Sequence, residues 1–567
     1  METKVTHPWF AHYPKEIPTT IQYDERTLQS YLKEAAEVSP EKGAIHFIGK
    51  ELTYKELYTS SLKLANQLVK LGVKKGDRVA IMLANTPQAV ISYYGALFAG
   101  GIVVQTNPLY VEREVEHLLN DSGAEIMICL DLVYSRVANV FDKTKLRHVI
   151  VTGIQDFLPF PKSLIYPFIQ KKNTGITINV QYNEKILKFK KVLEEGVARE
   201  IEVDIDPKED LALLQYTGGT TGPAKGVMLT HYNLVANTTQ CVRWTYKLKK
   251  GEEKMLAALP FFHVYGMTVV MNLSIMDHHK MIILPKFNPI DVLKSIQKHK
   301  ITLFPGAPTM YIALLNHPKI SEFDLSSIEV CLSGSAALPL EVQSNFEKIS
   351  GGSLVEGYGL TETSPVAIAN FVWGKRKTGS IGVPWPDTDA AILNIETGEP
   401  GQPKEIGEVM IKGPQVMKGY WNRPEDTQAT FKDGWFLTGD MGYMDEEGFF
   451  YIVDRKKDMI IAGGFNIYPR EIEEVLYEHE KIQEVCIVGV PDPYRGETVK
   501  AFIVLKDGQT ITEEELDQFC RQHLASFKVP RLYEFRKELP KTMIGKILRR
   551  VLLEEEKKKH EDQVKEK

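Results

Sequence analysis

Two hydrophobic periodicities alternate along the first half of the chain. Apolar residues recur at helical spacing from Tyr54 to Leu71, which predicts a helix that ends before Gly72. Short apolar runs bounded by turn residues predict strands between the helical stretches. The predicted strands are 78–83, 102–105, 126–130, 282–284 and 302–304, and the further predicted helices are 88–99 and 112–122. Strands that alternate with helices predict an α/β fold with helices on both faces of a sheet.

Residues 79–111 contain no charged side chain, and a stretch of this length could span a bilayer. Polar residues and two prolines interrupt it, and Gly100-Gly101 divides it near the middle. A membrane span would place these interruptions in hydrocarbon, where backbone polar groups find no water. The pattern therefore favours a strand, a buried helix and a second strand inside a globular domain.

The pattern changes in the last third of the chain. Glycine-bounded strands at 407–412 and 448–453 predict a small β-rich subdomain, and the charged run 454–458 predicts an exposed linker. We therefore predict a large N-terminal domain of layered α/β sheets that includes this subdomain and covers residues 1–453. The run 454–458 would then join it to a small domain at 459–567.

The C-terminal segment shows both periodicities in a length typical of one domain. Helices are predicted at 470–479 and 513–523, and strands at 484–490 and 500–505. Together these elements predict a compact α+β unit. The Glu- and Lys-rich tail after Arg550 predicts a solvated end that is helical or frayed.

Composition and charge exclude several classes of protein. A chain of 567 residues is too long for one hydrophobic core, and a net charge of −5 lacks the basic field of nucleic-acid-binding proteins. Five scattered cysteines without a CxxC pair are typical of a reducing compartment. The first residues do not form an apolar signal segment. We expect a cytoplasmic protein without a nucleic-acid partner, and the sequence leaves a homodimer open.

The segment 157–172, FLPFPKSLIYPFIQKK, combines aromatic residues, prolines and a basic end. Such a segment could lie at a membrane surface, so that the protein would sit peripherally on the inner face of the membrane. The alternative is a surface excursion packed on the protein, because three prolines oppose one continuous helix. The sequence does not decide between them.

The sequence YTGGTTGPAKG at 216–226 has the composition of a phosphate-binding loop. Glycines let the backbone approach an anion, while hydroxyls, N–H groups and a lysine hold it. The loop follows the apolar strand 211–214, but it is not a Walker loop because Gly222 is not followed by Lys-Ser/Thr and no helix begins there. Its density of glycine and threonine makes an unspecific surface loop a poor explanation.

This loop resembles the phosphate loop of the adenylate-forming superfamily, which includes acyl-CoA and aryl-CoA synthetases. Further motifs of that family follow in the family's order, at 260–266, 333–337, 357–362, 438–440, 454–458, 463–469 and 540–546. The resemblance covers residues 25–552 and is greatest to the bacterial long-chain fatty-acid–CoA ligases. It implies an acid–thiol ligase that forms acyl-AMP and pyrophosphate from ATP and a fatty acid, and then acyl-CoA and AMP. Fatty-acid degradation or lipid synthesis would use the product.

The resemblance also implies the binding residues for ATP and magnesium. Glu362 and Thr217 supply oxygen atoms of the kind that Mg²⁺ prefers. Asp440 accepts hydrogen bonds from the ribose hydroxyls, because a carboxylate is an acceptor only. The predicted ATP-binding residues are Thr217, Gly218, Gly219, Thr220, Thr221, Gly222, Lys225, Gly334, Ser335, Ala336, Gly357, Tyr358, Gly359, Thr361, Asp440 and Arg455.

The predicted catalytic residues are Lys546, Thr217, Glu362 and His263. Lys546 would lower the repulsion between the substrate carboxylate and the α-phosphate. Each of Asp440, Arg455 and Lys546 taken alone would be a solvated surface charge; only the ordered motifs favour a site. His263 borders the acyl and phosphate pockets by resemblance, with a satisfied core histidine as the alternative. It is not a general base, because a carboxylate needs no deprotonation near pH 7.

The remaining implied residues concern the acyl chain and coenzyme A (CoA). The predicted acyl pocket contains Phe262, Val264, Tyr265, Gly266, Gly306, Ala307 and Pro308. The small C-terminal domain would be mobile and rotate about Lys457, bringing the CoA path of Gly463, Gly464 and Phe465 to the acyl-AMP. Adjacent glycines permit the close backbone approach that a narrow channel requires.

Three other functions stay open at this point. The substrate could be a medium-chain or aryl acid, or the enzyme could load a separate carrier protein. A nucleotide-binding regulatory or scaffolding protein without turnover is the third. Lys546 and the Gly463-Gly464 loop argue against this third function, because ATP binding alone needs neither.

Overall fold

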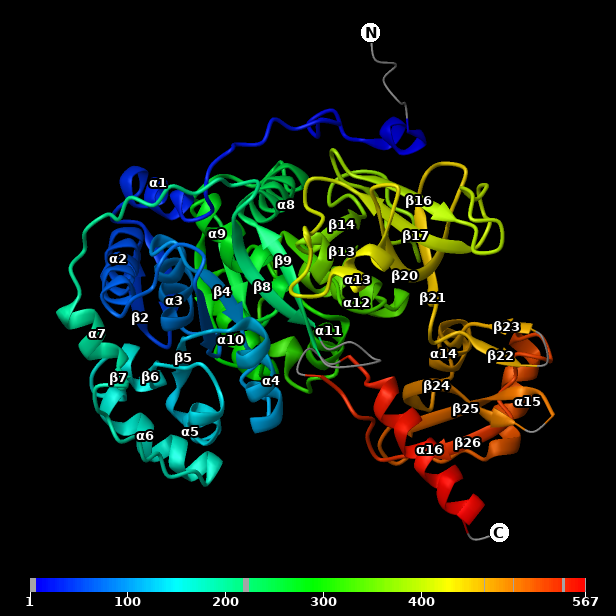
Figure 1. The fold of residues 1–567 in the computed structure, drawn as a ribbon. Coiled ribbons are helices and arrows are strands. Elements are labelled where there is room, and N and C mark those ends of the chain that lie inside the picture. The colour runs from blue at the N-terminus through cyan, green and yellow to red at the C-terminus, as the bar shows by residue number, and fades with distance from the viewer. Residues whose placement is uncertain (1–6, 218–223, 463–464, 493, 543–545, 566–567) are drawn as a thin grey trace. The chain divides into compact units, whose positions relative to one another are not determined.

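The computed structural model describes residues 7–217, 224–462, 465–492, 494–542 and 546–565. It divides the chain into two compact units (Figure 1). The first comprises Met1–Asp389 and Lys412–Phe436, and the second comprises Ala390–Ile411 and Leu437–Lys567. The predicted domain limits at 453 and 459 stay a prediction.

An eight-stranded sheet forms the centre of the first unit, in the order β18-β9-β8-β4-β3-β5-β6-β7. The strands from β8 to β7 are parallel, whereas β9 pairs antiparallel with both β8 and β18. The bounds are β3 (Arg78–Met82), β4 (Ile102–Gln105), β5 (Ile126–Leu130), β6 (His148–Thr152), β7 (Ile186–Lys188), β8 (Leu211–Thr217), β9 (Lys225–Thr230) and β18 (Gly419–Tyr420). The predicted strands at 78–83, 102–105 and 126–130 are confirmed.

Two helices of the first unit begin at threonine caps. Thr53 and Glu56 form a reciprocal capping box at the start of α2 (Tyr54–Lys70). Thr86 accepts a hydrogen bond from the Ala89 N–H at the start of α3 (Pro87–Phe98). α2 and α3 lie side by side in Figure 1. The other helices of the unit are α1 (Ser30–Val38), α4 (Glu112–Ser122), α5 (Tyr134–Val140), α6 (Lys162–Thr174), α7 (Phe189–Glu195), α8 (His231–Trp244), α9 (Leu273–Met276), α10 (Pro289–His299), α11 (Pro308–Leu315), α12 (Leu340–Ser350) and α13 (Pro424–Thr430).

The uncharged stretch 79–111 folds as predicted into strand, buried helix and strand. Every residue of α3 from Pro87 to Leu97 is buried. Among the described residues, no helix is long and apolar enough to cross a membrane. The membrane-span interpretation of this stretch is therefore excluded.

Two further sheets of the first unit meet at Leu303. Their orders are β10-β11-β1-β2 and β12-β13-β14-β15. The predicted strand 302–304 does not form; Leu303 instead makes single bridges to Met255 and Val330, because Pro305 offers no N–H to extend a ladder. The bounds are β1 (Gly43–Phe47), β2 (Lys50–Thr53), β10 (Lys254–Ala257), β11 (Lys280–Ile283), β12 (Val330–Ser333), β13 (Ser353–Gly359), β14 (Val366–Ala369) and β15 (Val383–Pro384).

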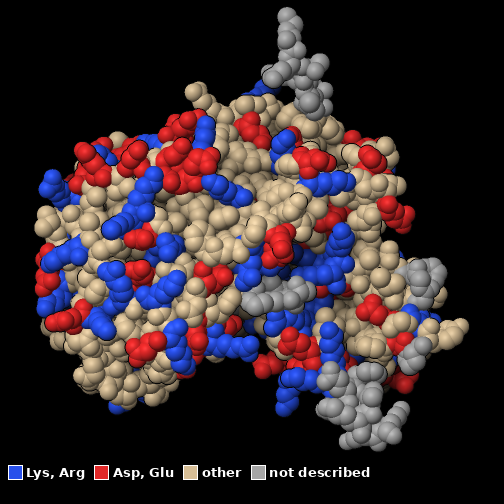
Figure 2. Space-filling model, in the orientation of Figure 1, with Lys and Arg blue, Asp and Glu red and all other residues tan. Residues whose placement is uncertain are grey.

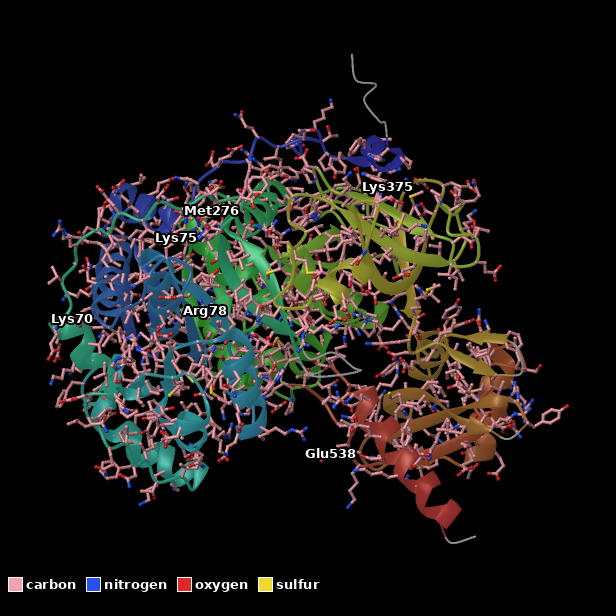
Figure 3. The ribbon with its side chains drawn as sticks, viewed as in Figure 1. Lys70, Lys75, Arg78, Met276, Lys375 and Glu538 are labelled. Carbon is pink, nitrogen blue, oxygen red and sulfur yellow. The ribbon has the colours of Figure 1, made fainter. Side chains whose placement is uncertain are left out.

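Polar contacts hold the amino-terminal end of β3, an interior strand of the large sheet. Arg78, labelled in Figure 3, donates to the carbonyl oxygens of Gly76, Ser122 and Gly123. Its guanidinium also lies 5.9 Å from the ring centroid of Trp421. The segment that carries β18 is thereby held against the start of β3.

The second unit contains two sheets. In the first, β16 (Asp389–Leu393), β17 (Gly407–Lys412) and β20 (Trp435–Met444) are neighbours, and β21 (Phe450–Arg455) pairs with β20. β19 (Phe431–Lys432) pairs with the start of β20, within the first unit. The other sheet has the order β23-β22-β25-β24, with β26 also on β25. Its strands are β22 (Ile460–Ala462), β23 (Phe465–Ile467), β24 (Ile482–Asp492), β25 (Gly496–Leu505) and β26 (Leu532–Phe535).

Three helices complete the second unit: α14 (Pro469–Tyr477), α15 (Glu513–His523) and α16 (Arg549–Lys565). Of these, α14 and α15 confirm predicted helices, and α16 confirms the helical form of the tail but not its full exposure. Ile472 of α14 and Leu516 of α15 join one apolar core with the sheet. Leu552 of α16 is fully buried in a second core, so the start of this helix is packed rather than solvated.

Besides the strand 302–304, two further expectations about local structure are wrong. α6 runs continuously through Pro167, because Pro159 and Pro161 precede its first turn and only one interior hydrogen bond is lost. The run 454–458 is not exposed throughout, since Asp454 is 5% exposed. Its carboxylate accepts hydrogen bonds from the backbone N–H groups of Arg455 and Arg470, at 2.7 Å each.

Candidate active site

The predicted nucleotide-binding segments of the first unit lie at or directly after the carboxyl ends of strands β8, β12 and β13, where α/β sheets bind ligands. Thr217 ends β8 and lies opposite Lys225, which begins β9. The predicted residues Gly218, Gly219, Thr220, Thr221 and Gly222 lie outside the described residues. The antiparallel pairing of β8 with β9 confirms that a strand follows the loop, as expected for a loop that is not of the Walker type.

Lys225, Tyr420 and Glu362 form a polar cluster beside Thr217. The Lys225 ammonium lies 2.9 Å from Oδ1 of Asp426 and 5.2 Å from the ring centroid of Tyr420. The Tyr420 hydroxyl donates to Oε1 of Glu362 at 2.8 Å. Burial and then the Glu362 charge raise the pKa of Tyr420 well above its usual value, so the hydroxyl keeps its proton. The cluster places a cation and an oriented carboxylate near the end of β8.

Tyr420 was not among the residues predicted from the sequence. Its segment is fixed by Trp421, whose indole N–H donates to the Asp121 carbonyl at 3.1 Å, while the Asp121 carboxylate accepts from the Tyr216 hydroxyl at 2.7 Å. The pair Tyr420-Trp421 after a glycine was the available signal. Nothing in the sequence connected Tyr420 with Glu362, which lies 58 positions earlier.

Replacing Tyr420 with phenylalanine should lower kcat/KM for ATP about tenfold, because a hydrogen bond to a charged group contributes about 1.5–3 kcal/mol. The Glu362 carboxylate would lose the hydrogen bond that Tyr420 donates and would be oriented less well. Steady-state kinetics with varied ATP measure the effect. Tyr246→Phe, which removes a hydroxyl that donates to the Trp373 carbonyl, is the matched control. Equal kinetics for both variants would contradict a role for Tyr420.

The adenine-facing segment and the aromatic motif meet at Gly334. A Cβ atom at Gly334 would lie 3.2 Å from the Tyr265 ring and 3.5 Å from the Gly357 carbonyl oxygen. Gly334, Tyr265 and Gly357 are therefore neighbours, as the motifs predict. Ser335, the next residue, has φ +75°, a strained value of the kind that clusters at functional sites. Ala336 is exposed beside it.

The turn from β13 into the predicted magnesium motif admits only glycine at position 359. A Cβ atom there would lie 1.8 Å from the Pro365 carbonyl oxygen. Tyr358 pairs with Ile368 in β14, and Thr361 and Glu362 then fall in a 3₁₀ turn, Thr361–Thr363. The turn is held in place because the Met417 N–H donates to the Glu362 carbonyl at 2.8 Å. The backbone thus fixes where the Glu362 side chain begins.

Asn85 and Gln215 hold the aromatic motif. The Asn85 amide donates to the carbonyls of Ala257 and Leu259 and accepts from the Phe261 N–H. The Gln215 amide donates to the Phe262 carbonyl at 2.9 Å. Nδ1 of His263 accepts a hydrogen bond from the Tyr265 N–H at 3.2 Å, which leaves Nε2 as the protonated nitrogen of a neutral ring.

Two of the predicted acyl-pocket residues, Tyr265 and Gly306, meet at the Leu332 carbonyl. That oxygen accepts from the Tyr265 hydroxyl at 2.7 Å, the Tyr311 hydroxyl at 3.1 Å and the Gly306 N–H at 2.9 Å. A Cβ atom at Gly306 would lie 3.1 Å from the Tyr311 ring. Two tyrosines and the glycine therefore form one rigid wall. The other predicted pocket residues are Phe262, which is partly exposed, and the buried Val264, Gly266, Ala307 and Pro308.

In the second unit, the predicted ribose residues are paired in register across β20 and β21. Asp440 is 2% exposed and its Oδ1 lies 2.6 Å from Nε of Arg455. Glu408 supports the same turn, since it accepts from the Gly439 N–H and the Lys456 ammonium at 2.9 Å each. The carboxylate of Asp440 is thus fixed in position by a neighbouring cation.

Lys546 belongs to the same unit and is affected by the same charges. Its backbone N–H donates to the Thr542 hydroxyl, and its carbonyl accepts from the Thr542 N–H. The residue as a whole is exposed, yet desolvation of the ammonium and then the Arg455 charge lower the pKa of Lys546 to about 8. Desolvation and Arg455 also lower the pKa of Lys457, the predicted hinge residue. The unit thus gathers Asp440, Arg455, Lys457 and Lys546.

We expect acyl-AMP formation to decline as pH rises through about 8, because the neutral Lys546 amine no longer offsets anionic charge. The protonated form, present below that pKa, is the active one. ATP–pyrophosphate exchange between pH 6.5 and 9.5 measures this limb. Arginine stays charged throughout this range. If a Lys546→Arg variant catalyses pyrophosphate exchange and its activity declines over the same pH range, the titrating group is not Lys546.

Arg549 joins the predicted hinge to the segment of Lys546, and sequence analysis did not single it out. Its guanidinium lies 2.9 Å from Asp458, 2.6 Å from Glu473 and 3.6 Å from Asp454. Its side chain is 18% exposed. Desolvation and the Arg549 charge act oppositely on Asp454, and the net effect raises the pKa of that carboxyl to about 6. One cation therefore links three carboxylates of the hinge and of α14.

The predicted CoA path is described only at its edge. Gly463 and Gly464 lie outside the described residues. Phe465 begins β23 and pairs with Ala462 at the end of β22. These positions stay a prediction.

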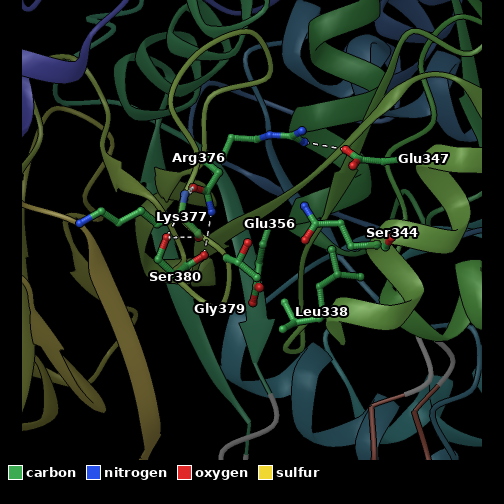
Figure 4. A pocket seen from close by; sticks show the side chains of 12 residues that line it. Leu338, Ser344, Glu347, Glu356, Arg376, Lys377, Gly379 and Ser380 are labelled. Atoms are coloured by element: carbon green, nitrogen blue, oxygen red, sulfur yellow. Dashed lines mark hydrogen bonds and ion pairs between the residues drawn. The ribbon is translucent and has the colours of Figure 1, made fainter.

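A cavity of about 500 Å³ lies between α12 and the loop 376–380 (Figure 4). An ion pair of 2.6 Å joins Arg376 to Glu347 at its wall. Glu356 also lines it, directly before Gly357, but none of its described lining residues is a predicted site residue. The cavity therefore adjoins the nucleotide motif without containing it.

Comparisons with known proteins agree with this geometry. The family model for AMP-binding enzymes matches residues 32–421, and the model for the C-terminal domain of AMP-binding enzymes matches 471–546. A long-chain-fatty-acid–CoA ligase of Bacillus subtilis is 59% identical over 98% of this chain and 99% of its own length. One of Escherichia coli is 41% identical over 96% and 98%. ATP-bound MatB from Rhodopseudomonas palustris superposes with a TM-score of 0.82 at 30% identity, covering 93% of this chain and 98% of that one.

Proposed function

Because the chain belongs to the AMP-binding enzyme family, we propose that it is a ligase that joins long-chain fatty acids to CoA at the expense of ATP. The observation that carries the proposal is the identity of 59% to the Bacillus subtilis ligase over nearly the whole of both chains. The predicted acyl-pocket residues bear no charge, which suits an apolar chain better than an acid with a second carboxylate.

In the first half-reaction, the fatty-acid carboxylate attacks the α-phosphorus of ATP and pyrophosphate leaves. Charge builds on phosphoryl oxygens, so fixed donors and cations supply most of the catalysis. We assign Thr217 and Lys225 to the phosphates and Gly334 to Ala336 to the adenine. Asp440 with Arg455 holds the ribose. Lys546 reduces the repulsion between the two reacting anions.

The residues around Glu362 fit a magnesium ion. A partly buried carboxylate and the Thr217 hydroxyl offer oxygen donors only, and phosphate oxygens and water would complete the octahedral shell that Mg²⁺ demands. Tyr420 orients the carboxylate by its hydrogen bond. When bound, the ion would neutralise phosphate charge. Among the described residues, no group of three His, Cys, Asp or Glu offers an all-protein cage, which agrees with a metal that arrives with ATP.

In the second half-reaction, the CoA thiolate attacks the acyl carbonyl and AMP leaves. We propose that the C-terminal domain rotates about Lys457 between the steps, so that Lys546 withdraws and the Gly463–Phe465 segment receives the pantetheine. Hinges concentrate the backbone change at a few residues. The product is an acyl-CoA for fatty-acid degradation or lipid synthesis.

We further propose that the enzyme acts in the cytoplasm. The five cysteines are free and buried, which suits a reducing compartment. Contact with the inner face of the membrane and assembly into a homodimer belong to the same proposal. Both are open to measurement by vesicle binding and by sedimentation.

ATP–pyrophosphate exchange across acetate, octanoate, palmitate, oleate, benzoate and amino acids tests the function, followed by detection of the CoA thioester by mass. Exchange and thioester with palmitate or oleate would establish the long-chain ligase. Exchange without thioester would indicate an enzyme that loads a carrier protein. If the protein catalyses ATP–pyrophosphate exchange with none of these acids, the proposed ligase function is wrong.

A further inference from the structure

Helix α6 has its apolar and polar faces reversed relative to a helix of a soluble domain. Leu164 is 64% exposed and Phe168 76% exposed, whereas Gln170 is 4% exposed. Surface helices normally turn the apolar face to the core and the polar face to water. Packing of this domain does not explain the arrangement, and a large exposed apolar patch marks an interaction site.

The exposed residues form one continuous stripe. Leu164 and Phe168 are four residues apart, as are Ile165 and Ile169, so the two pairs lie on adjoining rows of the helix. Phe160, 80% exposed, extends the stripe before the first turn. Figure 2 shows an uncharged area at the lower left, where Figure 1 places α6. The stripe is therefore a patch and not a set of scattered side chains.

The protein holds this helix firmly on its inner side. α6 packs against the 3₁₀ turn Ile154–Phe157, and the Lys162 ammonium donates to the Ile48 carbonyl at 3.0 Å. Phe157 contacts the Phe189 ring of α7 with 6.4 Å between centroids, and Lys50 lies 5.0 Å from its centroid. Exposure of the stripe is therefore a property of a fixed element and not of a frayed end.

Positive charge follows the stripe at the end of the helix. Residues 157–191 contain seven lysines and one glutamate, although the whole chain has a net charge of −5. Lys171 and Lys172 end the helix and are exposed beside Phe168 and Ile169. Apolar side chains with lysines beside them match a surface that is apolar below and anionic above.

We propose that α6 docks on the surface of an anionic lipid bilayer, with its apolar stripe inserted below the head groups and its lysines against lipid phosphates. A second copy of the chain is a poorer occupant, because a two-fold contact would bring the lysines of both copies into one interface with only one glutamate from each 157–191 segment. The proposal goes beyond the ligase reaction and does not depend on it. A ligase docked in this way would take substrate from the phase into which fatty acids partition.

Co-sedimentation with phosphatidylcholine vesicles, with and without one-third phosphatidylglycerol, tests the proposal on the full-length protein. We expect binding to the anionic vesicles only. Leu164→Ser with Phe168→Ser should reduce the bound fraction roughly tenfold or more, since each buried methylene favours insertion. Lys171→Glu with Lys172→Glu should reduce binding to the anionic vesicles to the level seen with phosphatidylcholine alone. The matched control is Val38→Ser with Val197→Ser, which replaces valines that are 68% and 65% exposed elsewhere.

Two outcomes would overturn the proposal. One is unchanged vesicle binding by the α6 variants. The other is a protein that ignores vesicles but sediments as a dimer that Leu164→Ser with Phe168→Ser dissociates, which would make the stripe a self-association surface. ATP–pyrophosphate exchange with octanoate in solution should be normal in every variant, so that loss of folding and failure of the ligase proposal are recognised separately from loss of docking.

Discussion

Replacing Lys546 with alanine should lower acyl-AMP formation by a factor on the order of 10²–10³, the loss that follows removal of one fixed electrostatic contact to a transition state. Thioester formation from supplied acyl-AMP should remain largely intact, because we place Lys546 in the first half-reaction only. Pyrophosphate exchange measures the first step, and release of AMP from acyl-AMP and CoA measures the second.

The matched control is Lys506→Ala, an exposed lysine of the same unit that we place outside the site. It should leave both half-reactions unchanged. Equal losses in the two half-reactions of Lys546→Ala would mean that the residue is structural or that it serves both steps. Our assignment would then be wrong.

Replacing Arg549 with methionine should destabilise the second unit by about 3–5 kcal/mol, the usual cost of removing one partner from a buried ion pair. Three carboxylates, on Asp454, Asp458 and Glu473, would lose their shared cation. We also expect both half-reactions to decline, since hinge and Lys546 segment lose their common anchor. Hydrogen exchange of the amides in α14 and α16 measures the local stability.

Arg550→Met provides the comparison within the same turn of helix. Arg550 forms a surface ion pair with Glu554 at 2.7 Å, with side chains 49% and 53% exposed, and such pairs contribute at most about 1 kcal/mol. In this variant the amides of α14 and α16 should exchange their hydrogens at the same rate as in the unaltered protein. Similar exchange in the two variants would show that the buried cluster around Arg549 contributes little.

The regular elements were predictable because their periodicity is local. The helix 112–122 and the strands 102–105 and 126–130 agree with the structure residue for residue, and the helix 513–523 does as well. Each has apolar residues at its own period and a turn or cap at its ends. The strand 302–304 failed because pairing depends on neighbours in space, and Leu303 finds only single bridges.

The sequence predicted which candidate-site residues are neighbours where those residues fall in contiguous motifs, but not where the partners are distant in sequence. Gly334, Tyr265 and Gly357 come together as expected. Tyr420 was not predicted from the sequence, because the role that we propose for it depends on its contact with Glu362. In the sequence, Arg549 is one of several charged residues at the start of a charged tail. Its significance comes from folding, which removes it from water and surrounds it with carboxylates. The residues outside the described parts keep only their sequence-based assignment.

The burial of helix α3 also has a consequence for the protein during its synthesis on the ribosome. Tyr94 is fully buried, and its hydroxyl donates to the side-chain oxygen of Asn272 at 3.0 Å, 178 residues further along. At about 5–20 residues per second a ribosome needs roughly 9–36 s to add that length. During this time α3, which has no charged side chain, has been synthesised but cannot yet make its contact with Asn272. Newly made chains should therefore need protection by a chaperone until the first unit is complete.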